Sequence, residues 1–311
     1  MNPIPYSNKL ENNWQGHKNK IYARQRGLKV RDRLIPWNGR PLLMGILNIN
    51  NDSFAGDGRL DANWALERAV EMVAEGADII DVGGESARTN REAISEEEEI
   101  HRVRPFLEKF DQAMQSARPR GPTQVFPPLV SLNTWRPGVI EGCLKAGFDI
   151  LNDMGALPDA TNARLCARSG AALLIMHSQG EPKVSHKHVT YENVIQELMD
   201  FFVAKSRLAM DAGVLPESII LDPGIDFAKQ KNDNLKIYRD LEKFHALGFP
   251  ILLPISRKSV IGHTLGLKNP VERDAGTIAC LVAGTLRGAA IFRVHNISAA
   301  WLGLRAIEAV A

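Results

Sequence analysis

The sequence contains few cysteines, little net charge and no long hydrophobic run. Its three cysteines form no C-x-x-C pair, so we expect neither a disulfide framework nor a zinc site. No run of about 18 apolar residues is present, which argues against a membrane-spanning helix. A net charge of +2 over 311 residues argues against a nucleic-acid partner. Because residues 1–20 also lack the apolar core of a secretory signal, we expect a cytoplasmic protein that binds neither membrane nor nucleic acid.

Short apolar runs alternate with longer helical patterns from residue 42 to the carboxyl end. Each run is rich in Leu, Ile and Val, which is typical of parallel strands buried on both faces. The eight runs are residues 42–49, 78–84, 128–134, 149–155, 171–178, 218–224, 250–256 and 290–296. Eight alternations of strand and helix predict an α/β fold, a (β/α)₈ TIM barrel.

Other segments add detail to this barrel. Residues 28–37 are expected to form a small hairpin that closes its bottom, and residues 28–311 form one domain. Residues 1–27 are an N-terminal extension that need not be ordered. The acidic residues 96–99 follow Ser95 at a helix start, so we expect them to be a solvated face near the positive helix end.

One group of polar residues at the predicted strand ends points to a phosphate. The last strand of a TIM barrel neighbours the first, so Arg293, His295 and Asn48 should lie together. We expect Arg88 of the second loop to come within reach of them. Arginine offers a rigid fork matched to phosphate oxygens, and Asn48 offers a neutral oxygen for Mg²⁺. The alternative is that Arg293 and His295 pair with carboxylates on the last helix.

A second group, made of Asn133, Asn152, Asp222 and Lys258, points to a flat nitrogen heterocycle. A carboxylate at a barrel mouth can accept two parallel N–H bonds, which suits the amide-plus-amine edge of a pterin or guanine. Lys258 can donate to a ring carbonyl. Two alternatives stay open: Asp222 caps the turn at Pro223, and Lys258 is a surface cation or a Schiff-base lysine.

Motifs at successive strand ends carry a resemblance to dihydropteroate synthase. In order they read MGILNINNDSF, DVGGESAR, LNDMGA, LIMHSQG, LDPGIDFAK, PISRKSVIG and FRVHNI. The family is a TIM barrel, usually a dimer, that joins 6-hydroxymethyl-7,8-dihydropterin pyrophosphate to p-aminobenzoate and releases pyrophosphate with Mg²⁺. The resemblance therefore implies a Mg²⁺-dependent, homodimeric transferase of folate biosynthesis in the cytoplasm.

The resemblance also implies roles for single residues. Asn48 helps to hold Mg²⁺, and Arg293, His295 and Lys258 are the catalytic residues. The implied substrate-binding residues are Arg88, Asn133, Asn152, Met176, Asp222, Phe227, Ser256 and Lys258. Among them, Ser256, Phe227 and Lys258 are implied to face p-aminobenzoate.

The chain departs from the family pattern at several positions. Asn133 stands where the family has a pterin-contacting Asp, and Asp226 stands where it has Gly, which places a negative charge near the acceptor. The loops at residues 50–51 and 87–90 also differ. These departures keep open a pterin-binding paralogue that lacks synthase activity or uses a different acceptor. A pterin-dependent methyltransferase is less favoured, because the chain has no region left for a corrinoid carrier.

Overall fold

The computed structural model describes residues 27–37, 39–50, 59–85, 92–180, 182–184 and 189–310. Arg88, the loop positions 87–90 and residues 1–26 lie outside the described residues, so the predictions made for them stay predictions. Within the described ranges, no helix is both long enough and apolar enough to cross a bilayer.

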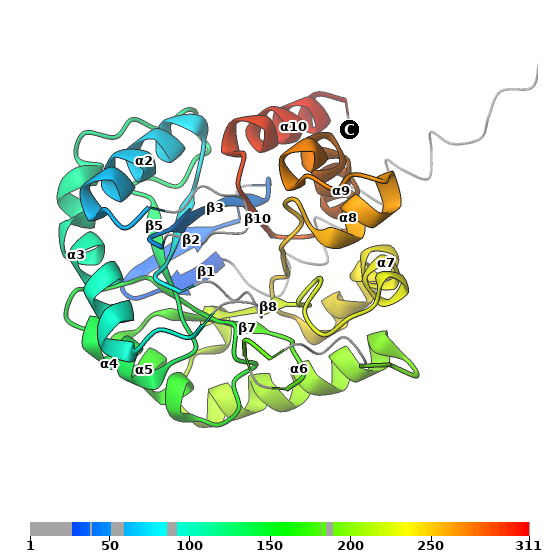
Figure 1. The fold of residues 1–311 in the computed structure, drawn as a ribbon, viewed down its shortest axis with the longest axis horizontal. Coiled ribbons are helices and arrows are strands. Elements are labelled where there is room, and N and C mark those ends of the chain that lie inside the picture. The colour runs from blue at the N-terminus through cyan, green and yellow to red at the C-terminus, as the bar shows by residue number, and fades with distance from the viewer. Residues whose placement is uncertain are drawn as a thin grey trace, which may run out of the picture.

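Parallel strands curl into a barrel at the centre of the molecule (Figure 1). In the described part of the chain the eight strands are β3 (Leu42–Asn48), β4 (Ile79–Gly83), β5 (Leu129–Asn133), β6 (Ile150–Asp153), β7 (Ala172–Met176), β8 (Ile219–Asp222), β9 (Leu252–Leu253) and β10 (Ile291–Val294). Their order around the sheet is β8-β7-β6-β5-β4-β3-β10-β9. The seam between β8 and β9 is held by a bridge between Leu221 and Ile251. Each predicted apolar run contains one strand, which confirms the TIM barrel.

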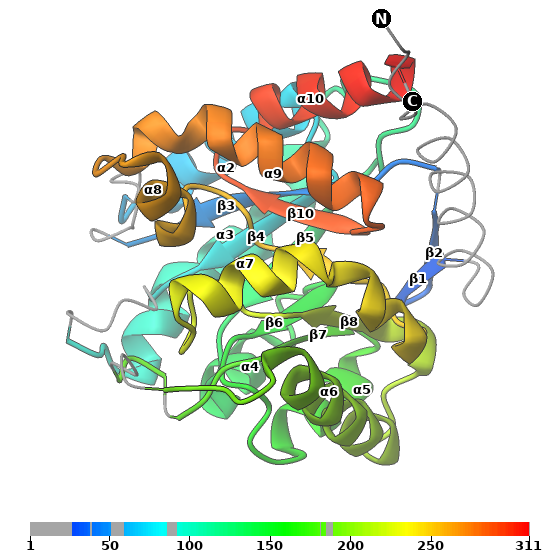
Figure 2. The ribbon, with the colours of Figure 1, turned by 90° about the vertical axis from the view of Figure 1, so that its right-hand side faces the viewer.

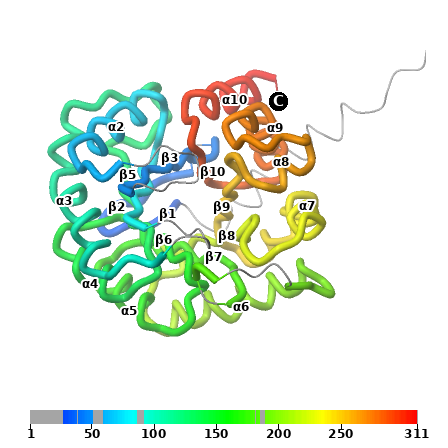
Figure 3. Tube along the Cα trace, in the orientation of Figure 1, coloured from blue at the N-terminus to red at the C-terminus, as the bar shows by residue number. Residues whose placement is uncertain are grey.

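Helices follow the strands and surround them, so that the chain runs once around the ring (Figure 3). They are α2 (Ala62–Glu75), α3 (Glu96–Met114), α4 (Pro137–Cys143), α5 (Thr161–Ser169), α6 (Val194–Asp211), α7 (Lys231–Arg239), α8 (Ser259–Leu265), α9 (Asp274–Leu286) and α10 (Ile297–Val310). Short 3₁₀ turns lie at η1 (Pro216–Ser218), η2 (Leu241–Leu247) and η3 (Pro270–Arg273). Local signals fix the ends: Asp61 caps α2 by accepting from Asn63 N, and Gly76 ends it with φ 115°.

The hairpin of β1 (Gly27–Val30) and β2 (Arg33–Pro36) closes the amino end of the barrel (Figure 2). Its apolar side chains Leu28, Val30 and Ile35 join the cluster that fills the barrel interior. Ser218 Oγ also donates to the backbone oxygen of Lys29 at 2.8 Å. The predicted bottom-capping hairpin is thus confirmed, and it begins one residue earlier than expected, at Gly27.

The expectation that residues 96–99 are all solvated is wrong for Glu99. Ser95 caps α3 as expected, since its hydroxyl accepts from Glu98 N at 3.2 Å. Glu99, however, is buried and lies 3.4 Å from Arg136 of the loop after β5. Burial raises the pKa of Glu99 to about 7, against the effect of Arg136. Glu99 is buried because it lies on the same inward side of α3 as Val103 and Phe106.

Candidate active site

A layer of polar residues lies inside the barrel, above an apolar layer. Alternate residues of a strand point to the same face, so a residue two positions after an interior one is also interior. The apolar interior layer includes Ile79, Leu129, Ile150, Leu174, Ile220 and Ile291. The residues two positions later are Asp81, Ser131, Asn152, Met176, Asp222 and Arg293. The predicted site residues Asn152, Met176, Asp222 and Arg293 therefore point inward at the carboxyl end of the barrel, from β6, β7, β8 and β10. Asp81 of β4 points inward with them.

Asp81 of β4 is the hub of this layer, and the sequence reasoning missed it. It is fully buried and accepts hydrogen bonds from Ser131 Oγ at 2.6 Å and Asn133 Nδ2 at 3.0 Å. Asn152 Nδ2 lies 3.2 Å from both carboxylate oxygens, and Arg293 Nε donates to Oδ2 at 2.7 Å. One carboxylate thus joins residues of both predicted groups. Its inward position in the motif DVGGESAR was the signal that could have revealed it.

The predicted phosphate group is only partly assembled by direct contacts. Arg293 is paired with β4 rather than with a carboxylate on α10, so that alternative is wrong for Arg293. Among the described residues only its Nε is engaged, which leaves the two terminal nitrogens for a ligand. His295 Nδ1 lies 2.9 Å from Ser256 Oγ, which also accepts from His295 N. Asn48 lies on the inward face of β3, four residues beyond Met44, the ladder partner of Arg293.

Asp222 ends β8 in the polar layer, opposite its ladder partner Met176 of β7. Its Oδ1 accepts from Gly224 N at 2.7 Å, which confirms the turn cap. No other side-chain hydrogen bond engages this carboxylate within the described residues, so the second oxygen can accept from a ligand. Burial raises the pKa of Asp222 to about 6, and the charges of Lys258, Arg293 and Lys229 oppose that rise.

Lys258 follows β9 and points back across the mouth toward the loop after β8. Its Nζ donates to Ile225 O at 2.8 Å and lies 4.8 Å from the centroid of the Phe227 ring. Burial lowers its pKa, while the carboxylates of Asp226 and Asp222 oppose this change. The reading of Lys258 as a surface cation is therefore wrong, and Lys258 lies beside Phe227, the other residue implied to face p-aminobenzoate.

Lys229 and His177 form a second pair that the sequence reasoning missed. Lys229 Nζ lies 2.9 Å from His177 Nδ1 and donates to the backbone oxygens of His177 and Phe227 at 3.3 and 3.0 Å. An ammonium can only donate, so His177 is neutral with its proton on Nε2. Burial and then Lys229 lower the pKa of His177 to about 2, and burial lowers that of Lys229 to about 7. The pair supports the turn that carries Asp222 and Phe227.

Comparisons with known proteins agree with this geometry. The model of a family described as pterin binding enzyme matches residues 44–295. The dihydropteroate synthase of Synechocystis sp. is 38% identical over 274 residues, which cover 88% of this chain and 91% of that protein.

Crystal structures of dihydropteroate synthase from Thermus thermophilus share the fold and are 35% identical to this chain. The complex with 6HMPPP has a TM-score of 0.76 and covers 92% of this chain and 99% of its own. The complex with 4-aminobenzoate has a TM-score of 0.78, with 92% and 100% covered. Since the family match, the sequence identity and the shared fold all extend over most of the chain, the chain belongs to the dihydropteroate synthase family of pterin-binding enzymes.

Proposed function

We propose that this protein is a dihydropteroate synthase of folate biosynthesis, located in the cytoplasm. It condenses 6-hydroxymethyl-7,8-dihydropterin pyrophosphate with p-aminobenzoate and releases pyrophosphate. The observation that carries the proposal is the arrangement of Arg293, whose Nε is fixed by buried Asp81 at 2.7 Å. Its remaining nitrogens form the fork that suits a phosphate. A protein that only bound a pterin would not need this group, which favours the synthase over the paralogue.

The pterin half of the site is supported by acceptors that lack partners. Asn133 Nδ2 donates to Asp81, so the Oδ1 of Asn133 points away from Asp81. That Asn133 oxygen is buried without a partner among the described residues. Asp222 keeps one oxygen for a ligand. A buried acceptor without a partner is costly, so a ligand N–H group that meets it gains affinity. Asn133, Asp222 and Asn152 would hold the nitrogen edge of the pterin, and Met176 would pack beside it.

The chemistry is a displacement at the methylene carbon of the pterin. The lone pair of the arylamine forms the new C–N bond while the C–O bond to pyrophosphate breaks, and the leaving oxygen keeps the bonding electrons. The nitrogen carries a positive charge once the C–N bond has formed and then releases its proton to solvent, so no strong base is required. Arg293 and His295 stabilise the charge that develops on the leaving group. Lys258, Phe227 and Ser256 would place the acceptor, and Ser256 also holds the His295 ring.

Mg²⁺ is the proposed cofactor, and Asn48 is its proposed protein ligand. No group of three or more His, Cys, Asp or Glu side chains within the described ranges could hold a metal ion. Mg²⁺ usually keeps several waters and is bound through few protein oxygens plus substrate phosphates, so one amide oxygen beside the pyrophosphate suits it. When bound, the ion neutralises charge on the pyrophosphate.

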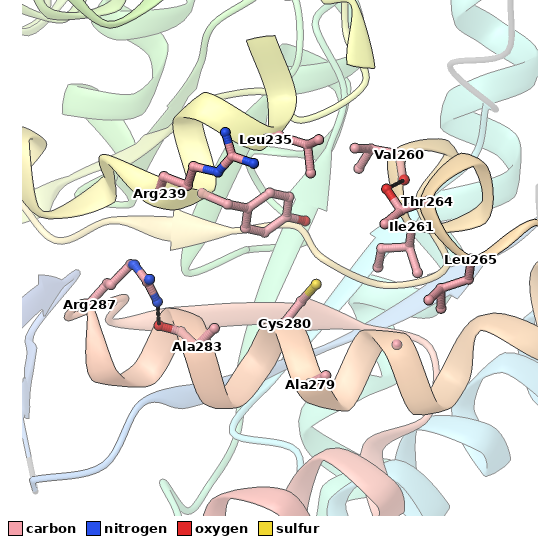
Figure 4. A pocket seen from close by; sticks show the side chains of 12 residues that line it. Leu235, Arg239, Val260, Ile261, Thr264, Leu265, Ala279, Cys280, Ala283 and Arg287 are labelled. Carbon is pink, nitrogen blue, oxygen red and sulfur yellow. Dashed lines mark hydrogen bonds between the residues drawn. The ribbon is translucent and has the colours of Figure 1, made fainter. Parts of the chain in front are cut away.

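A homodimer is supported by the outer surface of the barrel. An apolar pocket of about 320 Å³ lies between α7, α8 and α9 (Figure 4). Its lining includes Leu235, Ile261, Cys280 and Leu265, and Leu265 is 53% exposed. A second copy of the chain that covered this face would bury that surface and leave the barrel mouth open.

The proposal is tested by mixing the purified protein with the pterin pyrophosphate, Mg²⁺ and p-aminobenzoate. We expect release of pyrophosphate together with dihydropteroate, identified by mass spectrometry. Tight binding of the pterin pyrophosphate by calorimetry without any release would contradict the synthase and select the paralogue.

A further inference from the structure

Asp226 has a backbone conformation that side chains rarely adopt. Its φ is 68°, in the left-handed region that glycine prefers, and it is followed by Phe227 and by Ala228 with φ 49°. Such a conformation costs energy unless surrounding contacts hold it in place. The contacts of the Asp226 side chain should therefore explain why it stands where glycine would be easier.

The Asp226 carboxylate joins the loop after β8 to the start of α8. Its Oδ2 accepts from Ser259 N, and its Oδ1 accepts from Val260 N at 3.3 Å. Asn234 of α7 holds the same residue from the other side, since Asp226 N donates to Asn234 Oδ1 at 2.8 Å. The first N–H groups of α8 are therefore already used by a carboxylate of the chain itself.

This carboxylate lies between the residues that would face the acceptor. Phe227 follows it directly, and Lys258 precedes the Ser259 amide that it binds. Lys258 Nζ lies 4.8 Å from the centroid of the Phe227 ring, which brings together the neighbours in the chain of Asp226 and of the Ser259 amide that it binds. After burial, which lowers the pKa of Lys258, the charge of Asp226 is the largest influence and raises that pKa.

We propose that Asp226 is a specificity-determining residue that weakens the preference of this enzyme for p-aminobenzoate, whose carboxylate is charged, over neutral arylamines. The inference rests on the proposed function, which places the acceptor beside Phe227 and Lys258. A carboxylate on the acceptor would face the like charge of Asp226, and it would find the backbone donors at the start of α8, Ser259 N and Val260 N, already occupied. A neutral arylamine meets neither obstacle.

Two substitutions separate charge from shape. Asp226→Asn removes the charge but keeps an oxygen that can accept from Ser259 N, and asparagine tolerates the left-handed conformation. Asp226→Gly keeps the backbone conformation and removes both the charge and the cap. Asp233→Asn is the matched control, because Asp233 lies in the first turn of α7 and accepts from Gln230 N rather than from α8.

The test compares two acceptors that differ in charge at the same position, p-aminobenzoate and 4-aminobenzamide. Dissociation constants are measured by calorimetry on the full chain with Mg²⁺ and pyrophosphate present, so that no turnover occurs. We expect Asp226→Asn to raise the preference for p-aminobenzoate about 10-fold over wild type, as for removal of a partly screened like charge. Asp226→Gly should shift the preference in the same direction, and Asp233→Asn should leave it unchanged.

Several results would overturn the inference. One is a change of less than twofold in the preference for p-aminobenzoate over 4-aminobenzamide in Asp226→Asn. Another is an equal change in the dissociation constants of both acceptors. A third is a shift of the same preference in Asp233→Asn as large as that in Asp226→Asn. Absence of arylamine binding in every variant would also overturn it. The proposed function is judged separately, by pyrophosphate release from the wild-type protein. A protein that binds arylamines but releases no pyrophosphate fails as a synthase. The ratio of the two arylamine dissociation constants still decides the role of Asp226.

Discussion

Arg293 of β10 and Asp81 of β4 form an ion pair across strand β3, with Nε 2.7 Å from Oδ2. The pair holds the guanidinium by one edge and presents the other edge at the barrel mouth. Because Asp81 also accepts from Asn133 and Asn152, it fixes the proposed pyrophosphate and pterin contacts relative to each other.

Arg293→Lys should impair catalysis although it keeps the charge. One ammonium cannot both pair with Asp81 and offer a fork to the pyrophosphate. We expect kcat/KM for the pterin pyrophosphate to fall about 30- to 150-fold, as for the loss of about 2–3 kcal/mol from a charged hydrogen bond. Steady-state pyrophosphate release measures the change. Arg305→Lys on the exposed face of α10 is the control, and a value for Arg293→Lys within threefold of wild type would refute the role.

Asp81→Asn should destabilise the protein as well as slow it. The asparagine cannot neutralise Arg293, and its NH₂ group meets the donors of Asn133 and Asn152. Removing one partner of a largely buried ion pair typically costs about 3–5 kcal/mol. Urea unfolding should show a clear loss of stability, whereas Glu308→Gln at the exposed pair with Arg305 should change it by less than about 0.5 kcal/mol. Equal stability of Asp81→Asn and Glu308→Gln would contradict the central structural role of Asp81.

Binding of the pterin pyrophosphate should weaken in acid through Asp222. Burial raises the pKa of this carboxyl to about 6, so it is ionised above that pH and protonated below it. A protonated carboxyl lacks the negative charge that strengthens the N–H bond from the pterin, so binding at pH 5 should be about tenfold weaker than at pH 8. Calorimetry across this range measures the change. Asp222→Asn should bind weakly with little dependence on pH, and a wild-type profile that is flat from pH 8 to 5 would count against the assignment.

The contribution of His177 to stability should be lost as the pH falls below 6.5. Burial beside Lys229 lowers the pKa of the folded imidazole to about 2, while an unfolded histidine titrates near 6.5. Only the unfolded chain takes up this proton as the pH falls, so the contribution is present above pH 6.5 and is lost below it. Between pH 7 and pH 5 we expect a loss of about 2 kcal/mol from this group. Urea unfolding at both values should show that the change in stability from pH 7 to pH 5 is about 2 kcal/mol more favourable for His177→Gln than for wild type, whereas the exposed His101→Gln should change as wild type does.

Leu265→Arg should convert a dimer into monomers. The substitution places a charge in the apolar pocket between α7, α8 and α9, where a second copy would have to desolvate it. Sedimentation velocity measures the mass. Leu215→Arg is the matched control, because Leu215 is 54% exposed but lies before η1. Identical masses for the two variants would remove the support for this interface.

Sequence alone determined the barrel and the location of its site. Apolar runs and helical stripes are local patterns, and the ring order of a TIM barrel then sets which strand ends meet. That reasoning found Asp222, Lys258 and Arg293. It could not give their partners, because a charge pairs with whatever the folded chain brings near it. Asp81 and Arg293 are 212 residues apart in the chain.

Tertiary structure also decided what the unexpected residues do. Asp226 was predicted only as a negative charge near the acceptor. In the structure its carboxylate accepts a hydrogen bond from Ser259 N at the start of α8. Glu99 is buried against Arg136 although it belongs to an acidic run. Lys229 and His177 gave no local signal, since burial and mutual contact alone set their charge states. Periodicity reports which face a residue occupies, whereas hydrogen bonding and desolvation depend on neighbours that are distant in the sequence.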